Sequence, residues 1–193
     1  MKILGVVCSP RKAGNTEILV TATLQAAADA GAETELVLIA GKKITPCDGC
    51  NACLKKGICK IKDDMQTISE QMEKADGIVF GTPVYFCNVT AQAKAIIDRT
   101  YPLAFHRKLR GKVAGAAVAA GSLGIGQVFS SLYTFFDLHR MVIAGSATGY
   151  GTDKGEVTKE GAGATFGGSA LEEARALGRR MVRLATQLEK GKA

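Results

Sequence analysis

The sequence has no tryptophan, and aromatic residues make up only 6% of its 193 residues. A sugar-binding site built from stacked aromatic rings is therefore not expected. Proline is also scarce, with four residues, which excludes a polyproline linker. The remaining composition, 47% hydrophobic and 22% charged, is that of a globular chain and argues against intrinsic disorder.

The chain also lacks an arginine-rich run, although lysine and arginine (25) exceed aspartate and glutamate (18) and give a net charge of +7. The basic residues are spread along the whole sequence, so we expect no nucleic-acid partner. No secretory leader is expected either, because the apolar run after Lys2 ends at Ser9.

A membrane partner is not expected, because the longest uncharged stretch, residues 113–136, is broken by glycines, serines and Gln127. This composition predicts a buried strand, a loop and the start of a helix. We therefore expect a cytoplasmic protein. Disulfides are rare in the cytoplasm, so the six cysteines need another role.

Short aliphatic runs alternate with helix-forming segments along the chain. The pattern predicts strands over residues 2–8, 33–39, 77–80, 113–119 and 141–144, and helices over 16–30, 64–74, 91–99, 127–140 and 170–190. This alternation indicates an α/β fold with a parallel sheet. Five strands favour a flavodoxin-like, doubly wound sheet in the order 2-1-3-4-5, formed by a single domain spanning residues 1–193.

Two segments interrupt the pattern. Residues 41–62, inserted after the second strand, form a cysteine-rich loop that carries four of the six cysteines. Residues 145–168 contain eight glycines. They predict a surface loop, or alternatively a lid or a subunit contact.

The four cysteines of the insertion are Cys47, Cys50, Cys53 and Cys59, separated by two, two and five residues. Three thiolates at successive C-x2-C spacing suit three corners of a [4Fe-4S] cluster, and a nearby fourth cysteine completes it. A zinc site is the alternative, although zinc ligands usually come as two separated pairs. Free thiols are the third possibility. The lysines around the loop would stabilise a negatively charged cluster or dock an acidic electron carrier.

The loop after the first strand leads directly into a helix, where hydroxyl groups, backbone N–H groups and the helix N-terminus can all face one anion. It is neither a Walker A loop nor a dinucleotide-binding loop. It therefore predicts a site for a phosphate monoester such as that of FMN, or else an ordinary turn between strand and helix. The candidate residues are Ser9, Arg11, Gly14, Asn15 and Thr16.

Two further loops follow the third and fourth strands, and the carboxyl ends of parallel strands are where ligands bind in open α/β sheets. One is a proline–aromatic loop that offers backbone donors and a stacking edge to a flat ring. The other is glycine-rich and allows close approach of a planar ligand. Their candidate residues are Pro83, Val84, Tyr85, Phe86 and Asn88 in the first, and Gly121, Ser122, Gly124 and Gly126 in the second.

Together these motifs resemble the iron-sulfur flavoproteins of the NAD(P)H-dependent FMN reductase superfamily. The resemblance also includes residues 97–99 and the region near Gly155. It implies one FMN and one [4Fe-4S] cluster per subunit, a homodimer or homotetramer in which one subunit's cluster lies near its neighbour's flavin, and a ferredoxin-like electron donor. The chain departs from the family pattern at Cys8, Cys87 and Val128.

We expect an electron-transfer oxidoreductase in which the cofactors supply the chemistry, and we assign no catalytic residue. Electrons would pass from ferredoxin through the cluster to FMN and on to oxygen, peroxide or a quinone. The first alternative is an NAD(P)H-dependent FMN or quinone reductase with a vestigial or zinc-binding cysteine loop. The second is a redox sensor without enzymatic activity.

Overall fold

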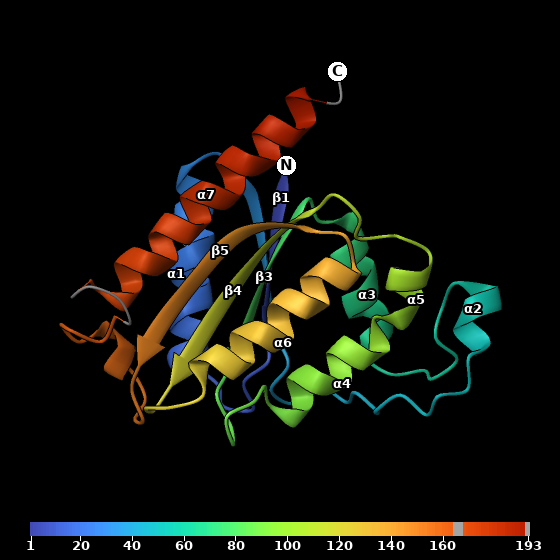
Figure 1. Ribbon diagram of the computed structural model, residues 1–193, viewed down its shortest axis with the longest axis horizontal. Helices are drawn as coiled ribbons and strands as arrows, with labels where there is room; N and C mark the ends of the chain where they lie inside the picture. The colour runs from blue at the N-terminus through green and yellow to red at the C-terminus, as the bar shows by residue number, and fades with distance from the viewer. Residues whose placement is uncertain (164–167, 192–193) are drawn as a thin grey trace.

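The computed structural model describes residues 1–163 and 168–191, and its centre is a five-stranded parallel sheet in the order β2-β1-β3-β4-β5 (Figure 1). The strands are β1 (Lys2–Val7), β2 (Glu33–Leu38), β3 (Gly77–Pro83), β4 (Val113–Ala120) and β5 (Val142–Tyr150). The predicted flavodoxin-like strand order is confirmed.

Helices cover both faces of the sheet, as a doubly wound fold requires. On one face lie α1 (Asn15–Asp29) and α7 (Ala170–Lys190). On the other lie α3 (Met65–Lys74), α4 (Ala91–Arg99), α5 (Tyr101–Phe105) and α6 (Ile125–Leu138). The short helix α2 (Ala52–Lys56) belongs to the cysteine-rich loop, and the 3-10 helix η1 (Glu156–Thr158) follows β5.

The central strands are almost entirely apolar, because each contributes side chains to two cores. In β1, Leu4 and Val6 pack against the α3, α4 and α6 side, whereas Ile3 and Val7 pack against the α1 and α7 side. All eight residues of β4 are buried. Continuous aliphatic runs are typical of strands covered on both faces.

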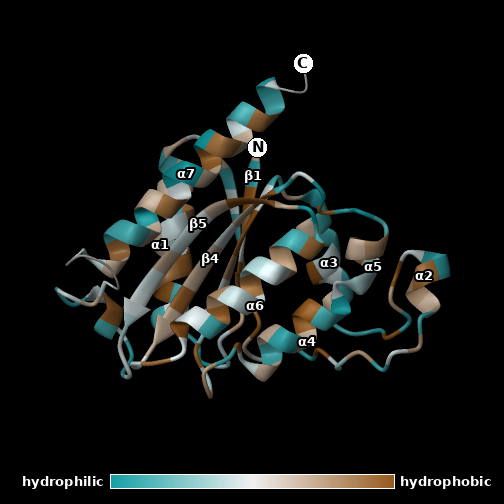
Figure 2. Cartoon of the chain, in the orientation of Figure 1, coloured by the Kyte–Doolittle hydropathy of each residue, from teal (hydrophilic) through white to brown (hydrophobic). Residues whose placement is uncertain are grey.

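The helix α7 is amphipathic, with hydrophobic and hydrophilic bands that recur along its length (Figure 2). Its buried face includes Leu177 and Met181. Between them, Gly178 lies so close to α1 that a Cβ atom there would be 2.1 Å from the backbone oxygen of Thr23. The two helices can approach this closely only because residue 178 has no side chain.

The main difference from the sequence prediction is β5, which was expected to end at residue 144 and instead reaches Tyr150. Side chains of α7 hold its outer edge. Arg180 donates to the carbonyl oxygens of Ala144 (3.2 Å) and Ser146 (3.3 Å), and Glu173 accepts from the backbone N–H of Thr148 (3.2 Å). Tertiary contacts thus extend a segment whose small residues suggested a loop.

The prediction of a loop beginning at residue 145 was therefore wrong for residues 145–150. The later part of this predicted loop includes residues 164–167, which lie outside the described residues. The short helices α2 and α5 were not predicted. Among the described residues, the helices all fall short of the length and apolar character needed to cross a bilayer.

Candidate functional site

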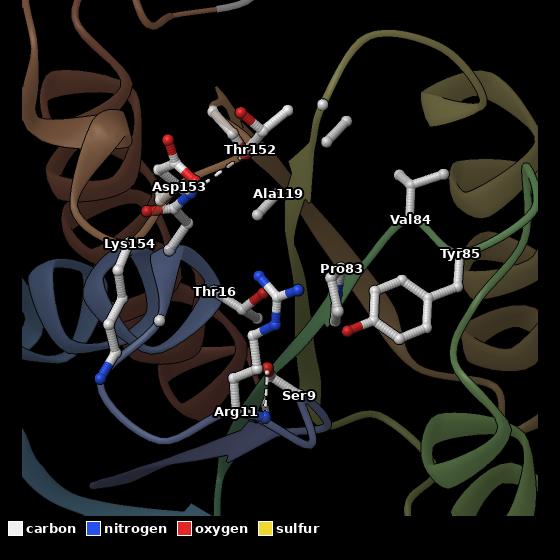
Figure 3. A pocket seen from close by; sticks show the side chains of 15 residues that line it. Ser9, Arg11, Thr16, Pro83, Val84, Tyr85, Ala119, Thr152, Asp153 and Lys154 are labelled. Atoms are coloured by element: carbon white, nitrogen blue, oxygen red, sulfur yellow. Dashed lines mark hydrogen bonds between the residues drawn. The ribbon is translucent and has the colours of Figure 1, made fainter.

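A cavity of about 280 Å³ opens where the carboxyl ends of β1, β3, β4 and β5 meet (Figure 3). Four loops that are far apart in the sequence contribute to its wall. The lining residues are Ser9, Arg11, Gly14, Asn15, Thr16, Pro83, Val84, Tyr85, Ala119, Ala120, Gly121, Gly151, Thr152, Asp153 and Lys154. This is the edge of the sheet at which the sequence placed the ligand site.

The first loop presents the N-terminus of α1 to the cavity. Its backbone is shaped by Ser9, whose Oγ accepts a hydrogen bond from the N–H of Arg11 at 3.1 Å. Gly14 is the N-cap of α1, and the helix begins at Asn15. N–H groups of the first turn have no acceptor within the helix, and together with the helix dipole they attract an anion. Arg11 extends into the cavity (Figure 3) and adds a positive charge.

Asn15 has a role that the sequence did not indicate. Its Nδ2 donates to the carbonyl oxygens of Gly151 (3.1 Å) and Asp153 (2.9 Å), and its Oδ1 accepts from the N–H of Gly155 (2.8 Å). The side-chain amide therefore donates both of its N–H groups to the loop after β5. Asn15 lines the cavity, and it also fixes the neighbouring wall formed by the loop after β5.

The loop after β5 is held from a second side by Glu156. Its Oε2 accepts from the backbone N–H groups of Thr152 (2.8 Å) and Asp153 (3.0 Å). Hydrogen bonds from Asp153, Lys159 and Thr152 lower the pKa of Glu156 to about 2. The ionised carboxylate of Glu156 thus stabilises this wall of the cavity.

The lining residues 151–154 were not predicted from the sequence as part of the site. They were missed because the sequence did not reveal how far β5 extends. A strand that ends at residue 144 leaves these residues within a long loop, whereas a strand that ends at Tyr150 brings them to the ligand-binding edge.

In the second loop, Pro83, Val84 and Tyr85 line the cavity, and the Tyr85 ring extends toward it from the side opposite α1 (Figure 3). The loop then turns sharply, because Tyr85 and Asn88 exchange two backbone hydrogen bonds of 2.9 Å. Phe86 lies at the tip of this turn and is fully exposed.

The structure places two predicted residues of this loop outside the cavity wall, Phe86 and Asn88. The side chain of Asn88 is also engaged locally, because its Oδ1 accepts from the N–H of Val89 at 2.8 Å. Neighbouring positions in one loop therefore have different surroundings, and the sequence alone did not show which of them line the cavity.

In the third loop, Gly121 lines the cavity, whereas Ser122, Gly124 and Gly126 do not. Gly124 is instead required for packing between the loops. Its φ is +92°, and a Cβ atom there would lie 2.6 Å from the Cα of Cys87. The departure at Val128 also has a structural reason, since this residue is fully buried in α6.

The four cysteines of the insertion come together around a second, smaller cavity of about 20 Å³. Cys47 and Cys50 are exposed, and Cys53 and Cys59 are partly buried. Burial raises the pKa of the Cys53 thiol, and the charges of the other three cysteines add to the increase.

The backbone of the insertion bends around this cavity. Gly49 (φ +69°) donates its N–H to the Sγ of Cys47 at 3.5 Å. Gly57 (φ +73°) ends α2 and donates its N–H to the carbonyl oxygen of Cys53 at 2.9 Å. Over residues 1–163 and 168–191, no group of three or more Cys, His, Asp or Glu side chains is arranged to hold a single metal ion. The four thiols surround a shared space instead.

The remaining two cysteines lie elsewhere. Cys8, at the end of β1, is fully buried, and burial raises the pKa of its thiol. Cys87 is exposed in the sharp turn of the second loop. Neither contributes to the cysteine cavity.

Comparison with known proteins agrees with this geometry. Residues 1–153 match the family model of NADPH-dependent FMN reductases. An iron-sulfur flavoprotein of Methanocaldococcus jannaschii is 38% identical over 200 residues, which cover 98% of this chain and 100% of that protein. Both matches indicate a flavin oxidoreductase.

Solved structures support the fold. RosB with a bound 8-demethyl-8-formylriboflavin-5'-phosphate has a TM-score of 0.74 and 18% identity, covering 100% of this chain and 82% of that chain. A WrbA-like flavodoxin from Agrobacterium tumefaciens has a TM-score of 0.65 and 19% identity, covering 96% and 97%. The chain belongs to the NADPH-dependent FMN reductase family and, within it, to the iron-sulfur flavoproteins.

Proposed function

We propose that this oxidoreductase binds FMN at the carboxyl edge of the sheet and a [4Fe-4S] cluster in the cysteine cavity. It accepts electrons from a ferredoxin-like carrier and passes them to an acceptor such as oxygen, peroxide or a quinone. When bound, FMN supplies one- and two-electron chemistry, and an iron–sulfur cluster supplies one-electron transfer. The observation that carries this proposal is the convergence of all four insertion cysteines on one cavity.

The flavin site fits a phosphate monoester attached to a flat ring. The N-terminus of α1, the Arg11 guanidinium and the buried Thr16 form the polar end of the cavity, suited to a dianion. Pro83, Tyr85 and the backbone of residues 119–121 form its opposite wall. The phosphate would be held by α1, and the ring would lie along the loops after β3 and β4.

The cysteine site fits a cluster because four thiols line one cavity and, among the described residues, no histidine lines it with them. Asp48 and Asp98 also line the cavity, but each carboxylate is paired with a lysine, Lys60 and Lys94 respectively. Cationic side chains accompany the sulfurs. Lys60 and Arg99 line the same cavity as the four cysteines. Positive neighbours stabilise thiolates and a negatively charged cluster.

The two sites share no lining residue, and the insertion with α2 extends away from the sheet on the side of α4 and α5 (Figure 1). Within one subunit they are separate. This separation supports a homodimer or homotetramer in which the cluster of one subunit serves the flavin of its neighbour.

The proposed electron carrier is acidic. Exposed lysines accompany the four cysteines in the sequence of the insertion and at its ends, and they include Lys42, Lys43, Lys55, Lys56 and Lys62. Such a patch accelerates encounter with a negatively charged partner, and the effect falls as salt rises. The alternative donor is NADPH, which the description of the matching family favours.

Anaerobic stopped-flow reduction separates these donors. We expect reduced ferredoxin to reduce the bound flavin rapidly, with a rate that falls at high salt, and NADPH to reduce it slowly. In Cys50→Ser protein the ferredoxin reaction should be lost, whereas the control Cys87→Ser should keep it. Rapid reduction by NADPH that is unaffected by Cys50→Ser would contradict the proposal.

A further inference from the structure

Arg99, the last residue of α4, carries a guanidinium group that is completely buried. Its Nη1 donates to Asp63 Oδ2 at 2.8 Å, and its Nη2 donates to Asp63 Oδ1 at 2.9 Å. This planar, two-pronged pair compensates for the removal of both charges from water.

The same guanidinium joins the two ends of the cysteine loop. Nη1 also donates to the carbonyl oxygen of Thr45 at 2.5 Å, and Nη2 donates to that of Ile61 at 3.2 Å. Thr45 stands two residues before Cys47, and Ile61 stands two residues after Cys59. Arg99 therefore closes the base of the loop that carries all four cysteines.

Asp63 strengthens this closure from the other side. Its carboxylate accepts from the backbone N–H of Thr45 at 2.8 Å and from that of Met65 at 3.1 Å. The Arg99–Asp63 pair thus ties the start of the loop, its end and the start of α3 to α4. A lysine at position 99 could keep the charge but not this planar set of donors.

One donor of Arg99 is left over. Among the described residues, its Nε–H is buried without a hydrogen-bond partner, whereas its other four N–H groups face acceptors. Buried N–H groups are rarely left unpaired, because losing water without a new partner costs free energy. Arg99 lines the cysteine cavity together with Cys59.

We propose that Arg99 is a positioning residue of the cluster site, whose Nε–H donates to sulfur when the cluster is bound. Its Nη groups, with Asp63, hold the two ends of the cysteine loop at the separation that the four thiolates require. This inference rests on the proposed function, because it assumes that the cysteine cavity holds an iron–sulfur cluster. Hydrogen bonds to sulfur are among the factors that set a cluster's reduction potential.

The test compares Arg99→Lys with Lys60→Gln in anaerobically purified holoprotein. Lys60 is a half-exposed cation that pairs with Asp48 and lies beside Cys50, so it controls for the general loss of positive charge. We expect Arg99→Lys to bind less than half the iron and sulfide of the wild type at unchanged FMN content. The cluster that remains should have a more negative midpoint potential in an EPR-monitored titration. Lys60→Gln should lose less cluster than Arg99→Lys and show a smaller shift.

If Arg99→Lys does not fold, a measurement on the wild-type protein still tests the inference. Protein labelled with 15N at arginine Nε and chemically reduced should show 15N hyperfine coupling to the cluster by pulsed EPR. Absence of this coupling, or an Arg99→Lys variant with wild-type potential and cluster content, overturns the role of Arg99. Wild-type protein that binds no iron or sulfide would instead overturn the proposed function itself.

Discussion

The side-chain oxygen of Asn15 accepts a hydrogen bond from the backbone N–H of Gly155 at 2.8 Å, across 140 positions of sequence. The Nδ2 group of Asn15 simultaneously donates to Gly151 and Asp153. The first residue of α1 thereby fixes the loop that forms one wall of the flavin cavity. The wall formed by the N-terminus of α1, where we propose that the phosphate binds, and the wall beyond β5 are thus one connected structure.

Asn15→Ala should weaken FMN binding by about tenfold. The variant loses three hydrogen bonds, each with a net contribution of about 0.5–1.5 kcal/mol, and part of that loss is expected to appear as disorder of the loop at residues 151–155. Isothermal titration of the apoprotein with FMN measures the effect. Asn88→Ala is the matched control, because Asn88 lies outside the cavity wall, and its FMN affinity should stay within about twofold of the wild type. Equal effects of the two substitutions would contradict this role of Asn15.

Gly178→Ala should destabilise the fold by about 1–3 kcal/mol, because the added methyl group would overlap the backbone of α1 and force the two helices apart. Urea denaturation measures the change. The control is Gly126→Ala in α6, where an added Cβ meets nothing within 4 Å. That variant should have wild-type or slightly higher stability, since alanine favours helix. A fully stable Gly178→Ala protein would show that α1 and α7 are not packed as closely as described.

The sequence was sufficient for the strand order and for the cysteine cavity, because alternating aliphatic and helical segments and C-x2-C spacing are local patterns. It was not sufficient for the end of β5. Residues 145–150 are small and glycine-rich, and they form a strand because they pair with β4. Arg180 and Glu173 of α7 add hydrogen bonds to the same segment. These interactions, and the cavity wall formed by residues 151–154 after the strand, are tertiary contacts that the local sequence does not reveal.

The roles of Asn15 and Arg99 were also beyond the sequence. In the sequence, Asn15 is one polar residue of the loop predicted to bind a phosphate, and its hydrogen-bond partners lie more than 130 positions away. In the sequence, Arg99 is the last residue of the helix predicted over 91–99 and part of the resemblance to the iron-sulfur flavoproteins, without an assigned role. Its burial and its bonds to Thr45, Ile61 and Asp63 appear only once α4 is packed beside the cysteine loop.

Acidification below neutral pH should destabilise the protein through His139. Burial lowers the pKa of this histidine from 6.5 to about 4. In the unfolded chain it takes up a proton near pH 6.5, whereas the folded protein resists protonation down to about pH 4. The stability contribution is therefore complete above pH 6.5 and is lost as the pH falls toward 4, by up to about 3 kcal/mol.

Denaturation at constant FMN content between pH 7 and pH 5 measures this loss. His139→Gln should flatten the dependence on pH, and His106→Gln, which removes the other histidine, should leave the contribution of His139 in place. A His139→Gln protein with the wild-type pH dependence would show that another group is responsible.

Cys87→Gly should stabilise the protein by about 0.5–1 kcal/mol. Cys87 has a φ of +55°, in the left-handed region that costs a residue with a Cβ atom about 1 kcal/mol. Cys87→Ala keeps the Cβ and should show no comparable gain. Thermal unfolding of the two variants gives the comparison, and a destabilised Cys87→Gly protein would mean that the thiol contributes contacts that outweigh the backbone cost.

The central claim is that four cysteines of one loop hold an iron–sulfur cluster in a protein that also binds FMN. The most direct measurement is the iron, acid-labile sulfide and flavin content of protein purified without air, for the wild type and for Cys53→Ser. The account predicts about four iron and four sulfide per FMN in the wild type, and flavin without a [4Fe-4S] cluster in the variant. Wild-type protein that carries FMN together with zinc and no sulfide would contradict it.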